Sequence, residues 1–275
     1  MALALGDLGA AVADGARSVE FADRSGDDFQ RMSTRTAHAD ALHQLGETDA
    51  ARAMFAEAES MQTAWQPKYP QLYSLPGFRY CDLVLAPAER AAWSAWLGQS
   101  VDPNQPGAEL GAVDACREMA RRAAQTLEWA ERNRLGLLTI ALDHLTLARA
   151  ALYAGAMTDP DGPPPTDAVA QADAAVAGLR AADTLSELPR ALLTRAWLRR
   201  RSGDAAVARS DLDEAQDLAE RGPMRLHLAD CHLHRARLLR DPAALAEARR
   251  LIEETGYRRR LPELQEAERA LTAPA

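Results

Sequence analysis

The sequence has almost no lysine. Lys68, in the stretch QPKYP, is the only one, and all other basic residues besides histidine are arginines. A Walker A loop needs a lysine in the pattern G-x-x-x-x-G-K-[ST], and this pattern does not occur. Neither G-x-S-x-G nor G-x-G-x-x-G occurs either. These absences exclude P-loop nucleotide hydrolysis from this sequence and count against several other enzyme classes. We therefore expect no enzyme activity, no catalytic residues and no cofactor.

Cysteines and long apolar runs are also scarce. The three cysteines, Cys81, Cys116 and Cys231, are an odd number and lie far apart, which does not suit a disulfide framework and favours a reducing compartment. The first residues, MALALGDLGAAVADG, lack a basic region and include Asp7, so they make a poor signal peptide. No run of about eighteen apolar residues is free of charge. We expect a cytoplasmic protein that does not span a membrane.

The residues that strands favour are few. Isoleucine occurs only at Ile140 and Ile252, and aromatic residues make up 5% of the chain. Alanine, leucine, arginine and glutamate, all strong helix formers, dominate instead. The composition predicts an all-α protein. Its net charge of −8 argues against a nucleic-acid partner, because nucleic-acid binding needs a basic surface.

Two stretches, 38–60 and 194–216, share one spacing of small, glycine and large residues. A small residue is followed seven positions later by glycine, and then by small, large and small residues at further steps of 5, 4 and 3. Glycine suits the left-handed end of a first helix, and small residues let two antiparallel helices approach closely. The matching residues are Ala39, Gly46, Ala51, Phe55 and Ala58, then Ala196, Gly203, Ala208, Leu212 and Ala215.

This pattern resembles the tetratricopeptide repeat (TPR), a helix–turn–helix unit of about 34 residues. Weaker matches start at Gly77, Ala148 and Ala236. The resemblance implies a TPR-like α–α superhelix, or solenoid, formed by residues 1–275 as a single domain of five to six helical hairpins. After a helix at 3–24, we expect helix pairs and a capping helix at these positions: 27–45 with 48–64, 71–86 with 109–132, 135–155 with 165–182, 188–202 with 204–221, 224–240 with 242–255, and 261–272 as the C-terminal cap.

Two insertions interrupt these units. Residues 156–165 are predicted to form a proline-rich loop. Residues 87–108 form an insertion in the second full unit, where AERAAWSAWLG predicts a short separate helix followed by a loop. Trp93 and Trp96 share one face of that helix. We favour packing against the solenoid, since aromatic residues are usually buried, and keep a docking patch as the alternative.

The resemblance implies a protein–protein interaction module that binds a peptide or partner protein in a concave groove lined by first helices. Carrying the family's groove positions over by spacing gives a set that mixes apolar residues with arginine, and arginine binds carboxylates well. We therefore expect an acidic partner with apolar anchors. The alternative is that these arginines pair with acidic residues of neighbouring helices. The predicted partner-binding residues are Phe78, Arg149, Leu193, Trp197, Arg200, Leu233, Arg237 and Arg240.

The long, uneven units are also similar to the TPR-like sensor regions of bacterial STAND-class signalling ATPases, including the NACHT branch. The sequence begins on a helix without a first partner and holds no nucleotide site of its own, which suits this alternative. The alternative function is then the C-terminal sensor fragment of a larger bacterial signalling or defence protein. The implied partner is an ATPase module in the same or another chain.

The stretch LHLADCHLH, residues 226–234, gathers residue types that bind metals. His227, Cys231 and His234 would share one helix face, and all are zinc-type ligands. Three ligands on one helix do not close a tetrahedral site, however. Cys231 as a nucleophile with His227 as its base lacks any oxyanion donor that the sequence reveals. We favour an ordinary repeat helix with no metal, and keep a metal-dependent or cysteine enzyme as the remaining alternative.

Overall fold

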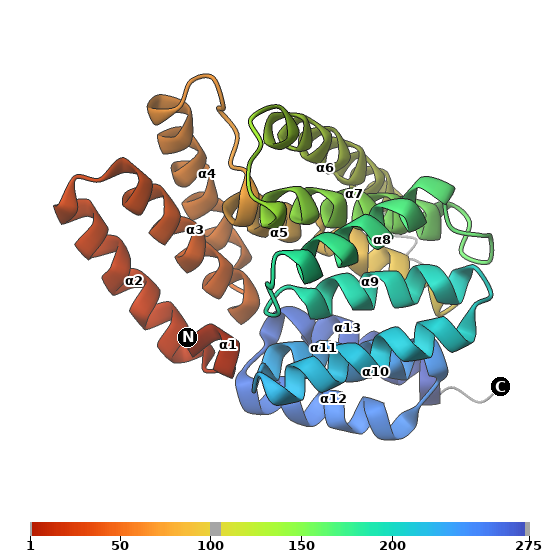
Figure 1. Ribbon diagram of the computed structural model, residues 1–275. Helices are drawn as coiled ribbons and strands as arrows, with labels where there is room; N and C mark the ends of the chain where they lie inside the picture. The colour runs from red at the N-terminus through yellow and green to blue at the C-terminus, as the bar shows by residue number, and fades with distance from the viewer. Residues whose placement is uncertain (1, 100–105, 273–275) are drawn as a thin grey trace.

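The computed structural model describes residues 2–99 and 106–272, and this part of the chain is helical without any strand (Figure 1). The predicted all-α class is confirmed. The helices are α1 (Ala2–Leu5), α2 (Leu8–Ser25), α3 (Asp28–Leu45), α4 (Thr48–Trp65), α5 (Ser74–Trp96), α6 (Pro106–Arg132), α7 (Leu137–Thr158), α8 (Thr166–Ala181), α9 (Leu188–Arg201), α10 (Ala205–Arg221), α11 (Arg225–Leu239), α12 (Pro242–Thr255), the 3₁₀ helix η1 (Arg258–Arg260) and α13 (Leu261–Thr272).

Most helices pack against the next one along the chain. The most extensive of these pairs are α7 with α8, α3 with α4, α6 with α7, α9 with α10, and α11 with α12. This arrangement of successive hairpins is consistent with a helical repeat (Figure 1). The helix α5 departs from the rule, because it packs more extensively against α7 than against its sequence neighbours α4 and α6. The helix α5 therefore does not form a simple hairpin with either of its neighbours in the sequence.

Local signals in the sequence explain where the helices begin and end. Asp27 caps α3, its side chain accepting from the Gln30 N–H at 2.8 Å. Asp241 caps α12 in the same way, with Pro242 as the first helical residue. At the other end of α3, Gly46 adopts φ +91°, the left-handed conformation that glycine takes without strain.

The repeated spacing corresponds to contacts between helices. The small and large residues of both matching stretches are almost completely buried, at 0–1% exposed. The two glycines of the pattern both have positive φ, as expected for residues that end a first helix. The buried members are Ala39, Ala51, Phe55 and Ala58, with Ala196, Ala208, Leu212 and Ala215.

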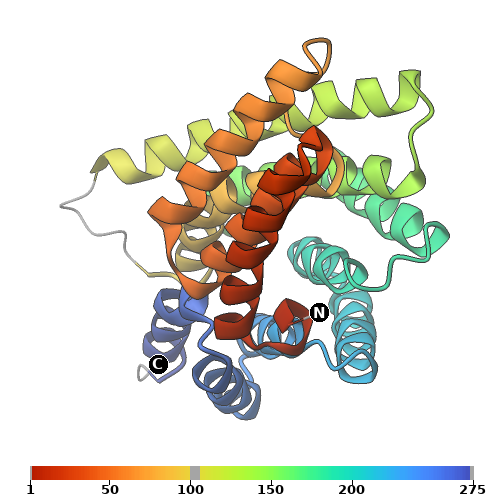
Figure 2. The same ribbon diagram turned by 90° about the vertical axis from the view of Figure 1, so that its left-hand side faces the viewer.

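The last helices return to the first half of the chain. The 3₁₀ helix η1 contacts α3, α13 contacts α5, and α1 contacts α11 (Figures 1 and 2). Close approach explains a glycine at one of these joints: a Cβ added at Gly46 would lie 3.0 Å from the Cβ of Arg258. Residues 261–272 form a helix with the predicted bounds, but this helix packs on α5 as well as on α11 and α12.

The predicted short helix in the 87–108 insertion is wrong. Residues 87–96 continue α5, with Pro87 inside the helix. Proline removes one backbone hydrogen bond and usually bends a helix, which made a break the natural expectation. Residues 100–105 of that insertion lie outside the described residues, and α6 begins at Pro106. In the 156–165 loop, residues 156–158 belong to α7.

One helix in the described part of the chain, α7, is long and apolar enough to cross a membrane by length and composition alone. Its most apolar window is 61% buried inside the protein. Core helices of soluble proteins meet the same criteria, and α7 contributes many residues to the largest hydrophobic cluster of the described residues.

Candidate functional site: a buried charge network

The interior holds a network of charged side chains contributed by five helical elements. Its centre is α5, where Asp82 and Glu89 lie seven residues apart and therefore on one helix face. Both are almost fully buried, at 1% and 3% exposed. The residues around them are Arg149 of α7, Arg190 of α9, Asp230 of α11, and Arg259 and Arg260 of η1.

Asp82 is bound by three guanidinium groups. Arg149 donates to its Oδ1 at 2.7 Å, and Arg259 donates to both carboxylate oxygens, at 2.6 and 3.2 Å. The guanidinium of Arg190 lies 3.4 Å from Oδ2. Asp82 therefore joins α5 to α7, α9 and η1 at a single point.

Arg260 connects α5, α11 and α13. Its Nη1 lies 3.0 Å from Oε1 of Glu89, and its Nε donates to Asp230 at 2.7 Å. Nη1 also donates to both oxygens of Glu263, at 2.7 and 2.8 Å. The hydroxyl of Tyr257 adds a bond to Asp230 at 3.2 Å. The segment after α12 is therefore bound to acidic residues of α5 and α11, while its Tyr257, Leu264 and Ala267 are buried in a hydrophobic cluster.

A second layer joins the network to the aromatic core. Arg237 of α11 donates to the Glu263 carboxylate at 3.2 Å and to its backbone carbonyl at 3.1 Å. The same guanidinium lies 4.6 Å from the ring centroid of Trp93, a cation–π contact. Trp93 stacks on Trp197 with a centroid separation of 3.5 Å. Arg237 thus contacts both the charge network, through Glu263, and the aromatic core, through Trp93.

The charges around the two α5 carboxylates decide their ionisation. Burial would raise the pKa of Asp82, but Arg259, Arg149 and Arg190 outweigh burial and hold this pKa well below its usual value. Burial would also raise the pKa of Glu89, but Arg260, Arg149 and Arg259 outweigh burial and lower this pKa to about 2. Both carboxylates are therefore anions at neutral pH, and each arginine that leaves would strand a buried charge.

The network surrounds a small cavity of about 30 Å³. The groups that line it include Asp82, Glu89 and Arg190, together with Thr194 and His234. A volume of this size can hold a water molecule but no peptide side chain. The interior is therefore filled by the chain itself.

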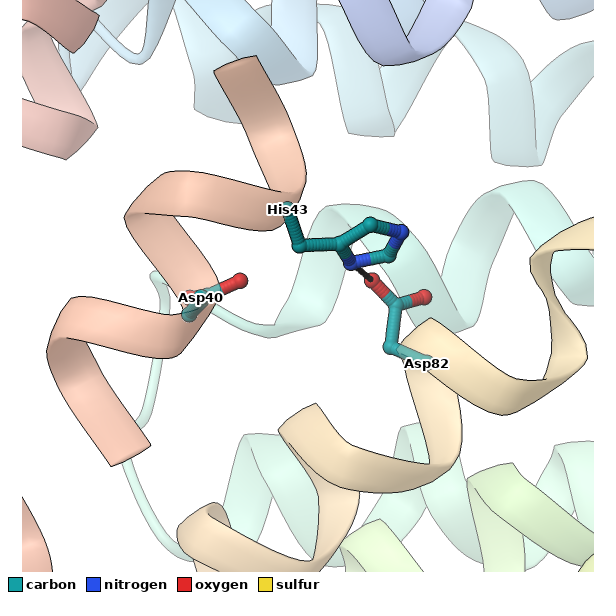
Figure 3. Close-up of side chains that lie close together, drawn as sticks. All are labelled: Asp40, His43 and Asp82. Carbon is teal, nitrogen blue, oxygen red and sulfur yellow. Dashed lines mark ion pairs between the residues drawn. The ribbon is translucent and has the colours of Figure 1, made fainter. Parts of the chain in front are cut away.

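The structure brings together a triad with metal-ligand chemistry. The ligand atoms of Asp40, His43 and Asp82 lie within 4.8 Å of one another, the only such group in the described residues (Figure 3). These atoms already have partners: Asp40 accepts from Gln44 at 2.7 Å and lies 3.3 Å from Arg79. Burial, then the charge of a nearby arginine, holds the pKa of His43 well below its usual value. A divalent cation would compete with the three guanidinium groups on Asp82, so the triad does not fit a metal.

The histidine-rich stretch in α11 forms no comparable group among the described residues. Cys231 is 1% exposed, and burial raises the pKa of its thiol far above its usual value. His234 donates from Nδ1 to the carbonyl of Asp230 at 2.9 Å and meets Trp93 edge to face. Burial lowers the pKa of His234 to about 4. These residues pack and hydrogen-bond within the core, and the thiol is not poised as a nucleophile.

The residues predicted to line the concave groove lie mostly in the interior of the structure. Among them, Arg237 and Arg149 are bound to acidic residues of the chain. Arg200 is partly exposed and donates to the Leu238 carbonyl at 3.4 Å, while Arg240 is exposed. A role in partner binding stays a prediction for all eight residues. The buried ones are Phe78, Arg149, Leu193, Trp197, Leu233 and Arg237.

The fold is incompatible with a docking role for Trp93, and such a role stays a prediction for Trp96. Trp93 has no exposed area and stacks between Trp197 and Arg237. Trp96 is partly buried and packs against the same hydrophobic cluster. The favoured interpretation, packing against neighbouring helices, is confirmed for Trp93.

Sequence reasoning missed the acidic half of this site. Asp82 and Asp230 stand inside apolar stretches, CDLVL and LADCHL, where a carboxylate on a buried face needs a partner. The run RRR at 258–260, directly before an amphipathic helix, offers such partners. These signals were visible, but no local pattern pairs positions 177 residues apart, as Asp82 and Arg259 are.

Comparison with known proteins finds no protein family whose model matches the sequence and no curated relative. The function is therefore inferred from the site and its contacts.

Proposed function

We propose that this protein is a protein–protein interaction module, a TPR-like array of helical hairpins whose interior binds a segment of polypeptide. One observation carries the proposal. The array already holds such a segment, residues 257–272, against helices α3, α5 and α11 through side-chain ion pairs and hydrogen bonds. The same surface has the chemistry to hold a segment of another chain.

The burial pattern supports the TPR-like interpretation. The two stretches with matching spacing bury the same small and large positions at helix–helix contacts. The glycines at the ends of their first helices, Gly46 and Gly203, have positive φ. Successive hairpins of this kind build extended inner surfaces that suit peptide recognition.

The proposal can be tested with the full chain as bait. Proteins captured from cells of the source organism would be purified and titrated one by one against the folded chain by calorimetry. We expect at least one protein to bind at 1:1 stoichiometry, and hydrogen exchange to show new protection at helices that face the interior. Binding by no purified candidate, or protection confined to the outer helix faces, would contradict the proposal.

A further inference from the structure

We propose that the acidic set Asp82, Glu89 and Asp230 is a receptor for a partner segment that carries two adjacent arginines followed three residues later by a carboxylate. In the structure described here, the chain's own Arg259, Arg260 and Glu263 occupy this receptor. The inference rests on the proposed function and specifies its partner and its regulation: the partner binds by displacing residues 257–272.

Charge complementarity identifies the guest. The receptor carboxylates come from α5 and α11, and Arg259 and Arg260 contact all three of them. A vacated receptor would leave buried anions with too few cations, which is unfavourable. Exchange therefore requires an incoming segment with the same pair of guanidinium groups. This reverses the expectation of an acidic partner held by arginines.

The backbone hydrogen bonds at the start of the occupant are local. Within η1, the amide of Arg260 donates to the carbonyl of Tyr257 at 3.0 Å, and that of Arg258 donates to Gly256 at 2.7 Å. The bonds to the array run through side chains instead, such as Arg90 to Glu266 at 2.6 Å. One backbone bond, from the Tyr257 amide to the Ile252 carbonyl of α12 at 3.0 Å, ties the start of the segment to the preceding helix, and its departure would break that bond.

The joint before the segment suits such a movement. Gly256 ends α12 with φ +68°, and no side chain or backbone atom lies within 4 Å of where its Cβ would be. A glycine with this freedom can change its backbone angles at little steric cost. A rotation there would break the bond from the Tyr257 amide to Ile252 and carry the residues after Gly256 away from the receptor, while the rest of α12 stays in place.

The occupant also leaves buried donors of two arginines near the receptor without a hydrogen-bond partner in the described part of the chain. The Nε and Nη1 atoms of Arg237 and the Nε of Arg190 are buried and donate to no group in the described residues. Both arginines belong to the array rather than to the occupant. A guest that places its carboxylate nearer to Arg237 than Glu263 lies would satisfy donors that the chain's own segment leaves unpaired, and would compete with it.

Peptide binding to the full chain tests the inference. The probe is a fluorescent peptide with the sequence of residues 256–272, and its control carries the changes Arg259→Gln and Arg260→Gln. The proteins are the wild-type chain, the variant Arg259→Gln/Arg260→Gln, and the matched variant Arg258→Gln, whose arginine is exposed. Anisotropy titration gives each affinity, and circular dichroism checks that each protein is folded.

We expect the double variant to bind the probe at least tenfold more tightly than the wild-type chain and the Arg258→Gln variant do. In those two proteins the internal segment competes at high effective concentration. The control peptide should bind the double variant at least tenfold more weakly than the probe. Equal affinity for both peptides, or no binding to a folded double variant, would overturn the inference.

A second measurement decides the matter if the double variant does not fold. Native-state hydrogen exchange of the wild-type chain should show α13 opening more readily than α9 and α11. Opening of α13 only together with these helices would overturn the inference. The proposed function is separable: a protein that binds the wild-type chain without competing with the probe would retain that function and reject this partner chemistry.

Discussion

Arginine pairs with aspartate or glutamate both in the interior of the protein and on its outer helix faces, but the exposure of these pairs to water differs. On the outside, Arg250 of α12 pairs with Glu247 and Glu254 while all three side chains stay well exposed. Inside, Asp82 and Arg259 pair with side chains 2% and 5% exposed. Water screens the outer pairs and would solvate either partner alone, whereas the interior leaves a lone partner unsolvated. The difference shows that position in the fold, not the number of ion pairs, decides which charges matter.

The largest effect is expected at the centre of the network. Asp82→Asn removes the charge that three arginines contact, and we expect unfolding free energy to fall by about 3–5 kcal/mol, as for other broken buried pairs. Urea unfolding at pH 7 measures it. Because the pKa of Asp82 lies below the ordinary 3.8, its contribution is present above about pH 4 and is lost as the pH falls further. A loss below about 1 kcal/mol would remove the contrast between interior and surface.

For a buried carboxylate that forms no ion pair with arginine, stability should change with pH in the opposite direction. Asp143 of α7 is buried beside Thr126, whose hydroxyl lies 2.7 Å from its Oδ1, and burial raises its pKa to about 7. The folded state therefore binds a proton that the unfolded state has lost, so stability falls as the pH rises from about 4 through 7. Asp143→Asn should abolish this dependence.

The gain from Asp143→Asn at pH 8 should be on the order of 4 kcal/mol, at about 1.4 kcal/mol for each of the roughly three pH units between 3.8 and the raised pKa. Urea unfolding of both proteins from pH 4 to 8 measures it. Parallel stability curves for the two proteins would mean that Asp143 ionises normally in the fold.

Two glycines with positive φ allow a comparison of a packed and an open position of the backbone. Gly46 (φ +91°) lies against Arg258, and Gly26 (φ +71°) has open space around its missing Cβ. Alanine at either position strains the backbone by about 1 kcal/mol. At Gly46 it also pushes against η1, so we expect Gly46→Ala to lower thermal stability more than Gly26→Ala. Equal losses would show that η1 does not pack tightly on the end of α3.

The smallest effect is expected on the outer face. Arg250→Ala should leave the urea midpoint unchanged within error, because its ion pairs with Glu247 and Glu254 are exposed and lie within one helix. A midpoint shift comparable to that of Asp82→Asn would contradict the distinction between the two kinds of ion pair.

Local signals predicted the helices well and the interior poorly. Asp241–Pro242 and Gly46 marked helix boundaries because capping depends on a few neighbouring residues. The helix α5 runs through Pro87 because packing in the fold outweighs the lost hydrogen bond, a tertiary effect that local propensity does not report. The return of Arg259 to Asp82 depends on how all the hairpins stack, so the charge network could not be read from sequence spacing.

The most direct test of the account is a double-mutant cycle between Asp82→Asn and Arg259→Gln, with Arg258→Gln in place of Arg259→Gln as the matched control. Unfolding free energies of the single and double variants give the coupling between the array and its internal segment. We predict a coupling of at least about 1.5 kcal/mol for Asp82 with Arg259, as for close charge pairs, and none for Asp82 with Arg258. Additivity within about 0.5 kcal/mol for Asp82 and Arg259 would contradict the claim that the interior carboxylates hold the segment.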